Sequence, residues 1–323
     1  MPRVALAYAL GGPEVLRIEE RPTGEPGPGQ VRLRHTAMGV NFADLLLLRG
    51  IHQKPELPSL SGREAAAVVE AVGPDVTSVR KGQRVCYLSV VGAFADERLI
   101  AADKLYPLPD DIDDKVAAAV LLKGMTAEYL LHATYPVKAG QTVLVHAAAG
   151  GVGSMLSQWA AHIGATVIGT VGSPDKVATA KANGCAHVID TRNEDFAARV
   201  KEITGGRGAD VIYDGIGRDV LDGNLDACAI RGYLINYGHA SGVPGPIDVM
   251  RINAKSMYFN KSNMFSYVTS REIGERMAAH VMEMAAKGVL KPQISRVYAL
   301  ADVARALADV ENRRTTGSVV VVP

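Results

Sequence analysis

A glycine-rich turn between an apolar run and an amphipathic run is the strongest candidate for chemistry in this sequence. Residues 143–146 (Val-Leu-Val-His) form a predicted strand, and Ala147, Gly150 and Gly153 follow at the spacing A-x-x-G-x-x-G. Small residues at this spacing let a backbone approach a pyrophosphate closely, and the N–H groups of a helix N-terminus meet its negative charge. A purely structural turn has a similar sequence. Placed among five alternating strands, however, the turn predicts a dinucleotide-binding site.

The residues after the next predicted strand bear on which dinucleotide binds. NAD-preferring sites usually carry Asp or Glu at the tip of that strand, about 20 residues beyond the glycines. Here Gly172, Ser173 and Lys176 follow the strand, without a carboxylate at its tip. A hydroxyl and a lysine suit the 2′-phosphate of NADP. Asp175 argues against a phosphate at this position, but it is interpreted as a cap of the next helix. The alternative to a phosphate contact for Lys176 is a solvated lysine at a helix start. The sequence favours NADPH over NADH.

Several other chemistries lack support in the sequence. No G-x-S-x-G elbow accompanies the Ser, His and Asp residues, so a hydrolase triad is not indicated. The acidic run 110–114 lacks EF-hand spacing and is interpreted as a solvated helix start. Three scattered cysteines, Cys86, Cys185 and Cys228, are too few for a disulfide framework or a Cys-rich zinc site and are expected to be small buried hydrophobes. His146 is interpreted as a packed core histidine.

Two patterns of predicted elements position these residues. The first third contains short strands separated by Gly/Pro punctuation, and from about residue 125 apolar strands alternate with amphipathic helices. Such alternation predicts a doubly wound parallel sheet in an α/β protein. The predicted strands are 4–8, 31–38, 65–72, 84–88, 143–146, 166–170, 187–189, 211–213 and 233–237, and the predicted helices are 126–132, 153–163, 176–183, 195–204, 272–287 and 301–311. A closing strand, 318–322, is expected to return to the first domain.

Composition narrows the class further. The 323 residues predict two domains, and 48% hydrophobic with 21% charged residues is typical of a globular chain. The net charge of +1 provides no excess of positive charge with which to bind nucleic acid or an anionic membrane. No apolar run approaches the roughly 18 residues that a membrane span needs. We expect a soluble, cytoplasmic protein that binds neither nucleic acid nor a membrane.

Eight short segments along the chain form a joint pattern: 11–16 (GGPEVL), 39–44 (GVNFAD), 122–126 (LKGMT), 146–153 (HAAAGGVG), 169–172 (GTVG), 201–205 (KEITG), 213–214 (YD) and 313–317 (RRTTG). In this order they resemble the zeta-crystallin-like quinone oxidoreductases, zinc-independent members of the medium-chain dehydrogenase/reductase superfamily. The resemblance covers essentially the whole chain. It implies a GroES-like, partly open β-barrel catalytic domain of residues 1–124 and 262–323, a Rossmann domain of residues 125–261, and NADPH in the cleft.

The resemblance also implies site residues. The expected cofactor contacts are Asn41, Tyr129, Gly150, Gly151, Val152, Gly153, Gly172, Ser173, Lys176, Thr191, Tyr237, Gly238, Lys261 and Arg313. The catalytic candidates are Asn41, His52 and Thr126, and for His52 a surface-loop histidine without a role is the alternative. Two departures from the family pattern matter: Leu46 stands where many relatives carry tyrosines, which makes the acceptor pocket more apolar, and Thr191 replaces a frequent tyrosine, with Arg192 beside it as a possible substitute.

Metal distinguishes this chain from the alcohol dehydrogenase branch. That branch carries a ligand cysteine near position 40 and a His-Glu pair where this chain has Gly62-Arg63-Glu64, together with a lobe of four cysteines that is missing here. No metal site is therefore expected. Without a Lewis acid the chemistry shifts to an acceptor that takes hydride unaided, and a quinone fits.

Three functions are consistent with this pattern. The leading one is NADPH-dependent quinone reduction without metal. The second is reduction of the activated C=C bond of an enone or 2-alkenal on the same scaffold, and the third is a non-catalytic nucleotide- or RNA-binding role. Because a Rossmann sheet has an exposed edge, a homodimer is expected, paired through a strand such as 247–252.

Overall fold

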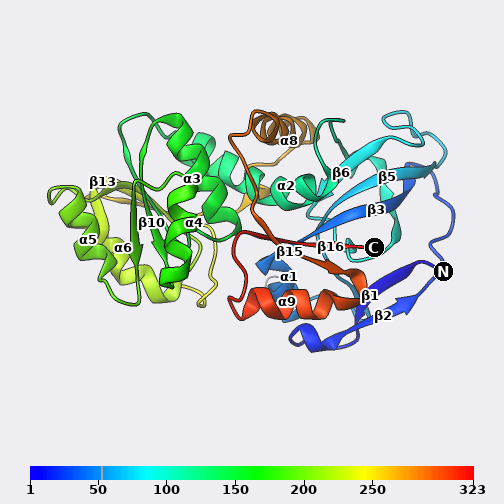
Figure 1. Cartoon of the computed structure of the whole chain (residues 1–323), viewed down its shortest axis with the longest axis horizontal. Coiled ribbons are helices and arrows are strands. Elements are labelled where there is room, and N and C mark those ends of the chain that lie inside the picture. The colour runs from blue at the N-terminus through cyan, green and yellow to red at the C-terminus, as the bar shows by residue number, and fades with distance from the viewer. Residues whose placement is uncertain (52–53) are drawn as a thin grey trace. The chain divides into compact units, whose positions relative to one another are not determined.

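The chain forms two structural units in the computed structural model, which describes residues 1–51 and 54–323 (Figure 1). The first unit comprises Met1–Lys123, Gly274–Gly288 and Pro292–Pro323, and the second comprises Gly124–Ile273 and Val289–Lys291. The first and last strands of the chain thus belong to the same unit, as the sequence predicted for 318–322.

The first unit is built on two largely antiparallel sheets, the β-rich core of a GroES-like domain. The larger sheet has the order β15-β16-β3-β5-β6-β8, with β7 paired to β3 off this path, and the smaller has the order β2-β1-β4. The bounds are β1 Arg3–Ala7, β2 Leu16–Glu20, β3 Gln30–Val40, β4 Ser59–Leu60, β5 Glu64–Val72, β6 Arg84–Leu88, β7 Glu97–Ala101, β8 Tyr106–Pro107, β15 Ile294–Ala299 and β16 Ser318–Val322. β16 pairs antiparallel with β3 and parallel with β15.

The valine run of β16 is buried on both faces of its sheet. Side chains alternate along a strand, so Val319 and Val321 pack in the main core of the first unit, whereas Val320 packs with Ala118 and Ala119 in a smaller cluster. A strand covered on both faces has no polar alternation. This explains why an uninterrupted valine run forms a strand here.

Four α-helices accompany these sheets: α1 Phe42–Leu48, α2 Asp114–Tyr129, α8 Arg271–Ala286 and α9 Val303–Glu311. Helix α1 begins after Asn41, where the Asp44 carboxylate accepts from Asn41 N and Asp44 N donates to the backbone oxygen of Asn41. Helix α2 begins in the first unit and ends in the second, because the boundary falls after Lys123.

The second unit is a six-stranded parallel sheet in the order β11-β10-β9-β12-β13-β14. The strands are β9 Thr142–Val145, β10 Thr166–Val171, β11 His187–Asp190, β12 Ala209–Asp214, β13 Cys228–Asn236 and β14 Tyr258–Lys261, and the helices are α3 Gly151–Ile163, α4 Val177–Ala182, α5 Phe196–Ile203, α6 Leu221–Ala227 and α7 Val249–Asn253. Helices α3 and α4 lie on one side of the sheet and α5 and α6 on the other (Figure 1). The strand order reverses between β9 and β12, which makes this a Rossmann sheet.

Short turns complete the chain: 3-10 turns at Pro13–Val15, Ala102–Lys104, Pro174–Lys176, Arg218–Val220, Met264–Ser266 and Leu300–Asp302, and a π turn at Leu130–Thr134. The prediction of an edge strand at 247–252 was wrong. Asp248 accepts from Met250 N and starts α7 there, so the apolar spacing belongs to a helix. The two edge strands of the sheet are β11 and β14.

Candidate functional site

The glycine turn joins β9 to α3 in the second unit. Strand β9 ends at Val145, and α3 begins at Gly151 with Gly150 as its N-cap. A Cβ at Gly153 would lie 2.2 Å from the carbonyl oxygen of Ala147, so only glycine permits this close approach. The first-turn N–H groups of α3 have no acceptor within the helix and lie at its positive end. The turn can therefore donate hydrogen bonds to an anionic group such as a pyrophosphate.

A buried histidine, His146, directly precedes this turn and contacts two neighbouring side chains. The His146 ring lies 2.9 Å from the Thr170 hydroxyl through Nδ1 and 2.6 Å from Asn224 Oδ1 through Nε2. Burial lowers the pKa of His146, which favours the neutral ring. A neutral ring that donates to Asn224 and accepts from Thr170 satisfies both contacts. The prediction of a packed core histidine is confirmed.

Cationic side chains flank the carboxyl end of β10. Ser173 is buried after this strand, Lys176 is half-buried and Arg192 is exposed. Arg192 Nε donates to Gly172 O. The Ser173 hydroxyl donates to Asp175, and this bond, with smaller contributions from Lys176 and Arg192, holds the pKa of the Asp175 carboxyl below its usual value. This edge thus carries two cationic side chains, together with the Asp175 carboxylate after β10 and the buried Asp190 carboxylate at the end of β11, whose Oδ1 accepts from Arg192 N.

Thr191 follows β11, beside the same edge. Its hydroxyl donates to Val171 O over 3.1 Å, and its N–H donates to the same oxygen over 3.0 Å. The threonine side chain therefore fixes the end of β10. In this arrangement it is Arg192, not Thr191, that contributes charge.

A buried carboxylate organises the far half of the sheet edge. Asp214, at the end of β12, is fully buried, and its Oδ1 accepts from Ile216 N and Gly217 N over 2.8 and 2.9 Å. Asn236 Nδ2 donates to Asp214 Oδ2 and to Gly238 O, each over 2.8 Å. Because the carboxylate fixes the loops after β12 and β13 together, Gly238 is held at the edge where the sequence placed it.

Tyrosines and a lysine border this half of the edge. Tyr129 is buried and stacks on Tyr267 with ring centroids 4.6 Å apart, and burial raises its pKa to about 12. Burial also raises the pKa of Tyr237, helped by Asp214. Lys261 ends β14, and partial burial lowers its pKa. These hydroxyls stay protonated at neutral pH and can donate hydrogen bonds.

The predicted cofactor residues of the second unit therefore lie at the same edge of the parallel sheet. Apart from Tyr129, which ends α2, each follows or ends a parallel strand at its carboxyl end: Gly150, Gly151, Val152, Gly153, Gly172, Ser173, Lys176, Thr191, Tyr237, Gly238 and Lys261. Ligands of doubly wound sheets bind at this edge, at the point where the strand order reverses.

In the first unit, Asn41 belongs to a buried network that the sequence did not predict. Its Nδ2 donates to Glu64 Oε2 over 2.9 Å, and its Oδ1 accepts from Lys123 Nζ over 2.9 Å. Lys123 and Glu64 also form an ion pair at 3.4 Å. One signal for Lys123 was present: it stands in the apolar run 117–127, where a charge is costly unless it is paired.

Asp44 lies against this network. It is fully buried and accepts from Asn41 N over 2.9 Å, while its other oxygen has no hydrogen-bond partner among the described residues. Burial raises the pKa of Asp44 to about 7, although Arg63 and Lys123 oppose the rise. The carboxyl is therefore close to its midpoint at neutral pH.

The other predicted site residues are less informative. Thr126 lies one turn after Lys123 on α2 and is nearly buried. Arg313 is exposed after α9 with a positive φ of 58°. His52 lies outside the described residues.

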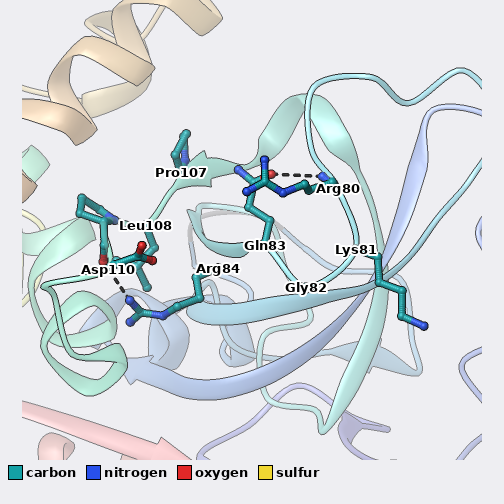
Figure 2. A pocket seen from close by; sticks show the side chains of 9 residues that line it. Arg80, Lys81, Gly82, Gln83, Arg84, Pro107, Leu108 and Asp110 are labelled. Atoms are coloured by element: carbon teal, nitrogen blue, oxygen red, sulfur yellow. Dashed lines mark hydrogen bonds between the residues drawn. The ribbon is translucent and has the colours of Figure 1, made fainter.

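The acidic run 110–114 is the helix start that the sequence predicted. Asp113 Oδ1 accepts from Lys115 N and Val116 N at the beginning of α2. Beside the run is a hollow of about 440 Å³ lined by Arg80, Lys81, Gly82, Gln83, Arg84, Pro107, Leu108, Pro109 and Asp110 (Figure 2). Arg84 is already committed to Pro109 O, Ile112 O and Asp114. The hollow is thus a consequence of how α2 is anchored.

Two features are absent from residues 1–51 and 54–323. Within them, no group of three or more His, Cys, Asp or Glu side chains is placed to hold a metal ion. None of the helices among them has the length and apolar character to cross a bilayer. The three cysteines are free and buried.

The GroES-like unit and the glycine-turn Rossmann unit together define a medium-chain dehydrogenase/reductase. In agreement, residues 27–110 match the alcohol dehydrogenase GroES-like domain, and residues 151–286 match the zinc-binding dehydrogenase family. Within this superfamily the chain belongs to the zeta-crystallin-like quinone oxidoreductases. The predicted family and fold class are confirmed.

Three relatives illustrate the likeness. A quinone oxidoreductase of Pseudomonas aeruginosa is 42% identical over 98% of each chain. A 2-haloacrylate reductase of a Burkholderia species is 44% identical over 100% of this chain and 99% of its own. The solved structure of an Escherichia coli quinone oxidoreductase in complex with NADPH superposes with a TM-score of 0.96 and 38% identity over 100% of both chains.

Proposed function

We propose that this protein is an NADPH-dependent quinone reductase that works without a metal ion. The observation that carries the proposal is the edge after β10, where Lys176 and Arg192 lie and where the strand itself does not end in a carboxylate. That charge suits a 2′-phosphate. Family membership supports the rest, since relatives of this length are named quinone oxidoreductases.

The residues of the second unit fit the cofactor. The Gly153 cradle and the first turn of α3 would hold the pyrophosphate, Ser173, Lys176 and Arg192 the 2′-phosphate, and Tyr129 the nicotinamide half. Bound NADPH supplies the hydride, that is, a proton with an electron pair. The chain binds and orients, which is the contribution that proximity makes to such a transfer.

On the acceptor side we assign Asn41 as a hydrogen-bond donor. Reduction of a quinone to a hydroquinone consumes one hydride and one proton, and negative charge develops on a carbonyl oxygen of the quinone before the proton arrives. An amide N–H aimed at that oxygen stabilises the charge. Thr126 and His52 are the candidates to pass on the proton, and Leu46, almost fully buried, makes the surroundings apolar.

Initial rates of NADPH oxidation at 340 nm, with a panel of small quinones and with NADH as control, test this function. We expect turnover of quinones with NADPH preferred and no loss of rate after treatment with a chelator. Absence of turnover with every quinone, or a rate restored only by added metal, would refute it.

A second candidate is reduction of an activated C=C bond. The relative named 2-haloacrylate reductase, at 44% identity, favours keeping it. Hydride would then add to the β-carbon of an enone or acrylate, and a proton to the α-carbon. Product analysis with an enone and 2-haloacrylate panel separates the two activities. A non-catalytic nucleotide- or RNA-binding role gains no support from the site, and a salt-dependent filter-binding titration would detect it.

We also propose a homodimer that buries the β14 edge. Six large apolar side chains that are at least half exposed lie on or near that strand in the sequence: Ile230, Val243, Val249, Met250, Tyr258 and Phe265. Tyr258 is presented by β14 and stacks on Tyr233 with centroids 4.4 Å apart. An exposed strand edge bordered by apolar side chains is a surface that proteins normally cover. Sedimentation equilibrium at micromolar concentration should give twice the chain mass, and a monomer would refute this.

Three further expectations stay predictions: the domain division at 1–124 with 262–323 and 125–261, the cytoplasmic location, and the absence of nucleic-acid and membrane partners. The first is supported by the two compact units and the second by the three free, buried cysteines.

A further inference from the structure

The first unit buries a charged pair for which the proposed reaction has no stated use. Lys123 is 4% exposed and Glu64 is fully buried, with Nζ and Oε2 3.4 Å apart. Burying two charges costs several kcal/mol per ion, and apolar side chains of similar volume are often as stable. Stability alone is therefore a weak reason for this pair.

The pair dictates which way the Asn41 amide points. A lysine ammonium only donates hydrogen bonds, and a glutamate carboxylate only accepts them. Lys123 Nζ must therefore face the amide oxygen, and Glu64 Oε2 must face the amide nitrogen, each over 2.9 Å. A flipped amide would set N–H against N–H and oxygen against oxygen. One orientation is allowed.

One amide N–H remains after these contacts. Asn41 Nδ2 carries two hydrogens, and one is used by Glu64. The other has Gly39 O at 3.5 Å, which is long for a hydrogen bond. It is thus available to a partner with a stronger acceptor, such as an oxygen that gains negative charge.

The backbone of α2 and β3 holds the Glu64 carboxylate in place. Glu64 Oε1 accepts from Leu122 N over 2.6 Å, so the carboxylate is fixed to helix α2. A Cβ at Gly39 would lie 2.4 Å from Glu64 Oε2 and 2.2 Å from Ala118 O. Strand β3 therefore needs glycine at this point for the carboxylate to reach the amide.

We propose that Lys123 and Glu64 are positioning residues, which lock the Asn41 amide so that its remaining N–H is presented in a single orientation to the reactants. The inference rests on the proposed quinone reductase function and extends it to two residues that do not themselves touch the acceptor. Their charges act through Asn41: the ammonium polarises the amide oxygen, and the carboxylate fixes the nitrogen.

Single substitutions separate kcat from binding. In Lys123→Met the amide loses the donor that fixes its oxygen, and we expect kcat with a quinone to fall about 10- to 100-fold, the range associated with a misplaced group. The dissociation constant for NADPH, measured by fluorescence titration without acceptor, should change less than threefold, because the predicted phosphate contacts lie elsewhere. An unchanged kcat in a folded Lys123→Met protein would overturn the proposal.

Glu64→Gln gives a second separation of kcat from binding. A glutamine side chain can turn either its oxygen or its N–H groups toward Asn41, so the Asn41 amide is no longer fixed from that side. We expect kcat with a quinone to fall, while the dissociation constant for NADPH changes less than threefold. An unchanged kcat in a folded Glu64→Gln protein would overturn the proposal.

A double variant distinguishes positioning from stability. Lys123→Met with Glu64→Gln removes both charges, so a merely structural pair predicts recovery of kcat toward wild type. Positioning predicts that kcat stays low even where the thermal midpoint recovers, because a glutamine amide no longer dictates the orientation of Asn41.

Arg84→Met is the matched control. It breaks the ion pair with Asp114 at the start of the same helix without touching Asn41, so it should lower stability and leave kcat unchanged. If wild-type protein reduces no quinone, the proposed function fails. If wild type is active and the double variant regains its kcat, only this inference fails.

Discussion

The strongest test of the cofactor assignment is to remove the positive charges at the end of β10. Lys176→Ala and Arg192→Ala each delete one cation from an edge that otherwise carries the Asp175 carboxylate. A 2′-phosphate brings nearly two negative charges to this edge, whereas NADH brings a hydroxyl. The two substitutions should therefore weaken NADPH and leave NADH almost unaffected.

The magnitude follows from the exposure of each side chain. Lys176 is half-buried, and a charge-assisted contact of about 1.4 kcal/mol corresponds to a tenfold loss of NADPH affinity. Arg192 is exposed and screened by solvent, so its contact is worth at most about 1 kcal/mol, or roughly fivefold. Because both side chains would contact one phosphate, the losses need not add, and the double variant should lose about 20- to 50-fold.

The assay is KM and kcat/KM for NADPH and NADH at two KCl concentrations. Screening should reduce the NADPH preference of wild type at high salt and have little effect on the double variant. Lys181→Ala is the matched control, an exposed lysine on the neighbouring α4. Equal losses for the two cofactors, or a Lys181→Ala protein as impaired as Lys176→Ala, would refute the assignment.

Three further outcomes are expected. Gly153→Ala places a Cβ 2.2 Å from the backbone oxygen of Ala147, so NADPH affinity, measured by titration, should fall at least tenfold and the free energy of unfolding, measured by calorimetry, by about 1–3 kcal/mol. Gly245→Ala is the control, because the space around Gly245 is open, and it should change neither quantity. The Asp44 carboxyl loses its proton near 3.8 when unfolded and at about 7 when folded, so the unfolding free energy should fall by about 4 kcal/mol as pH rises from about 4 to 7, and urea unfolding of Asp44→Asn should lack this slope. Tyr258→Arg should shift the sedimentation mass from dimer to monomer, and a dimer that survives would place the interface elsewhere.

Most of the Rossmann unit could be predicted from the sequence because its signals are local. Each strand is a short apolar run followed within a few residues by its ligand-side loop, and 143–146 and 166–170 correspond to β9 and β10 within a residue. Helix α2 was recognised only from residue 126, although it begins at Asp114. Residues 117–121 in its first half are all buried and therefore have no amphipathic period to detect.

The same distinction explains which parts of the site could be predicted. The glycine turn works through backbone N–H groups and the absence of a Cβ, and both are properties of consecutive residues. The Asn41 network works through side chains 23, 59 and 82 residues apart, which meet only after β3, β5 and α2 have packed. No spacing rule connects such positions, so their partnership becomes visible only in the structure.

A trace of that partnership is nevertheless present in the sequence. Lys123 interrupts the apolar run 117–127 of α2, and a cation in that position either pairs with an anion inside the protein or carries the full cost of desolvation. Glu64 begins a strand whose next residues are buried alanines, which poses the complementary problem for an anion. Each charge is unfavourable alone, and the fold resolves both by joining them across Asn41. Where two such anomalies occur in one domain, their pairing is the economical prediction, and the polar side chain between them is the place to look for function.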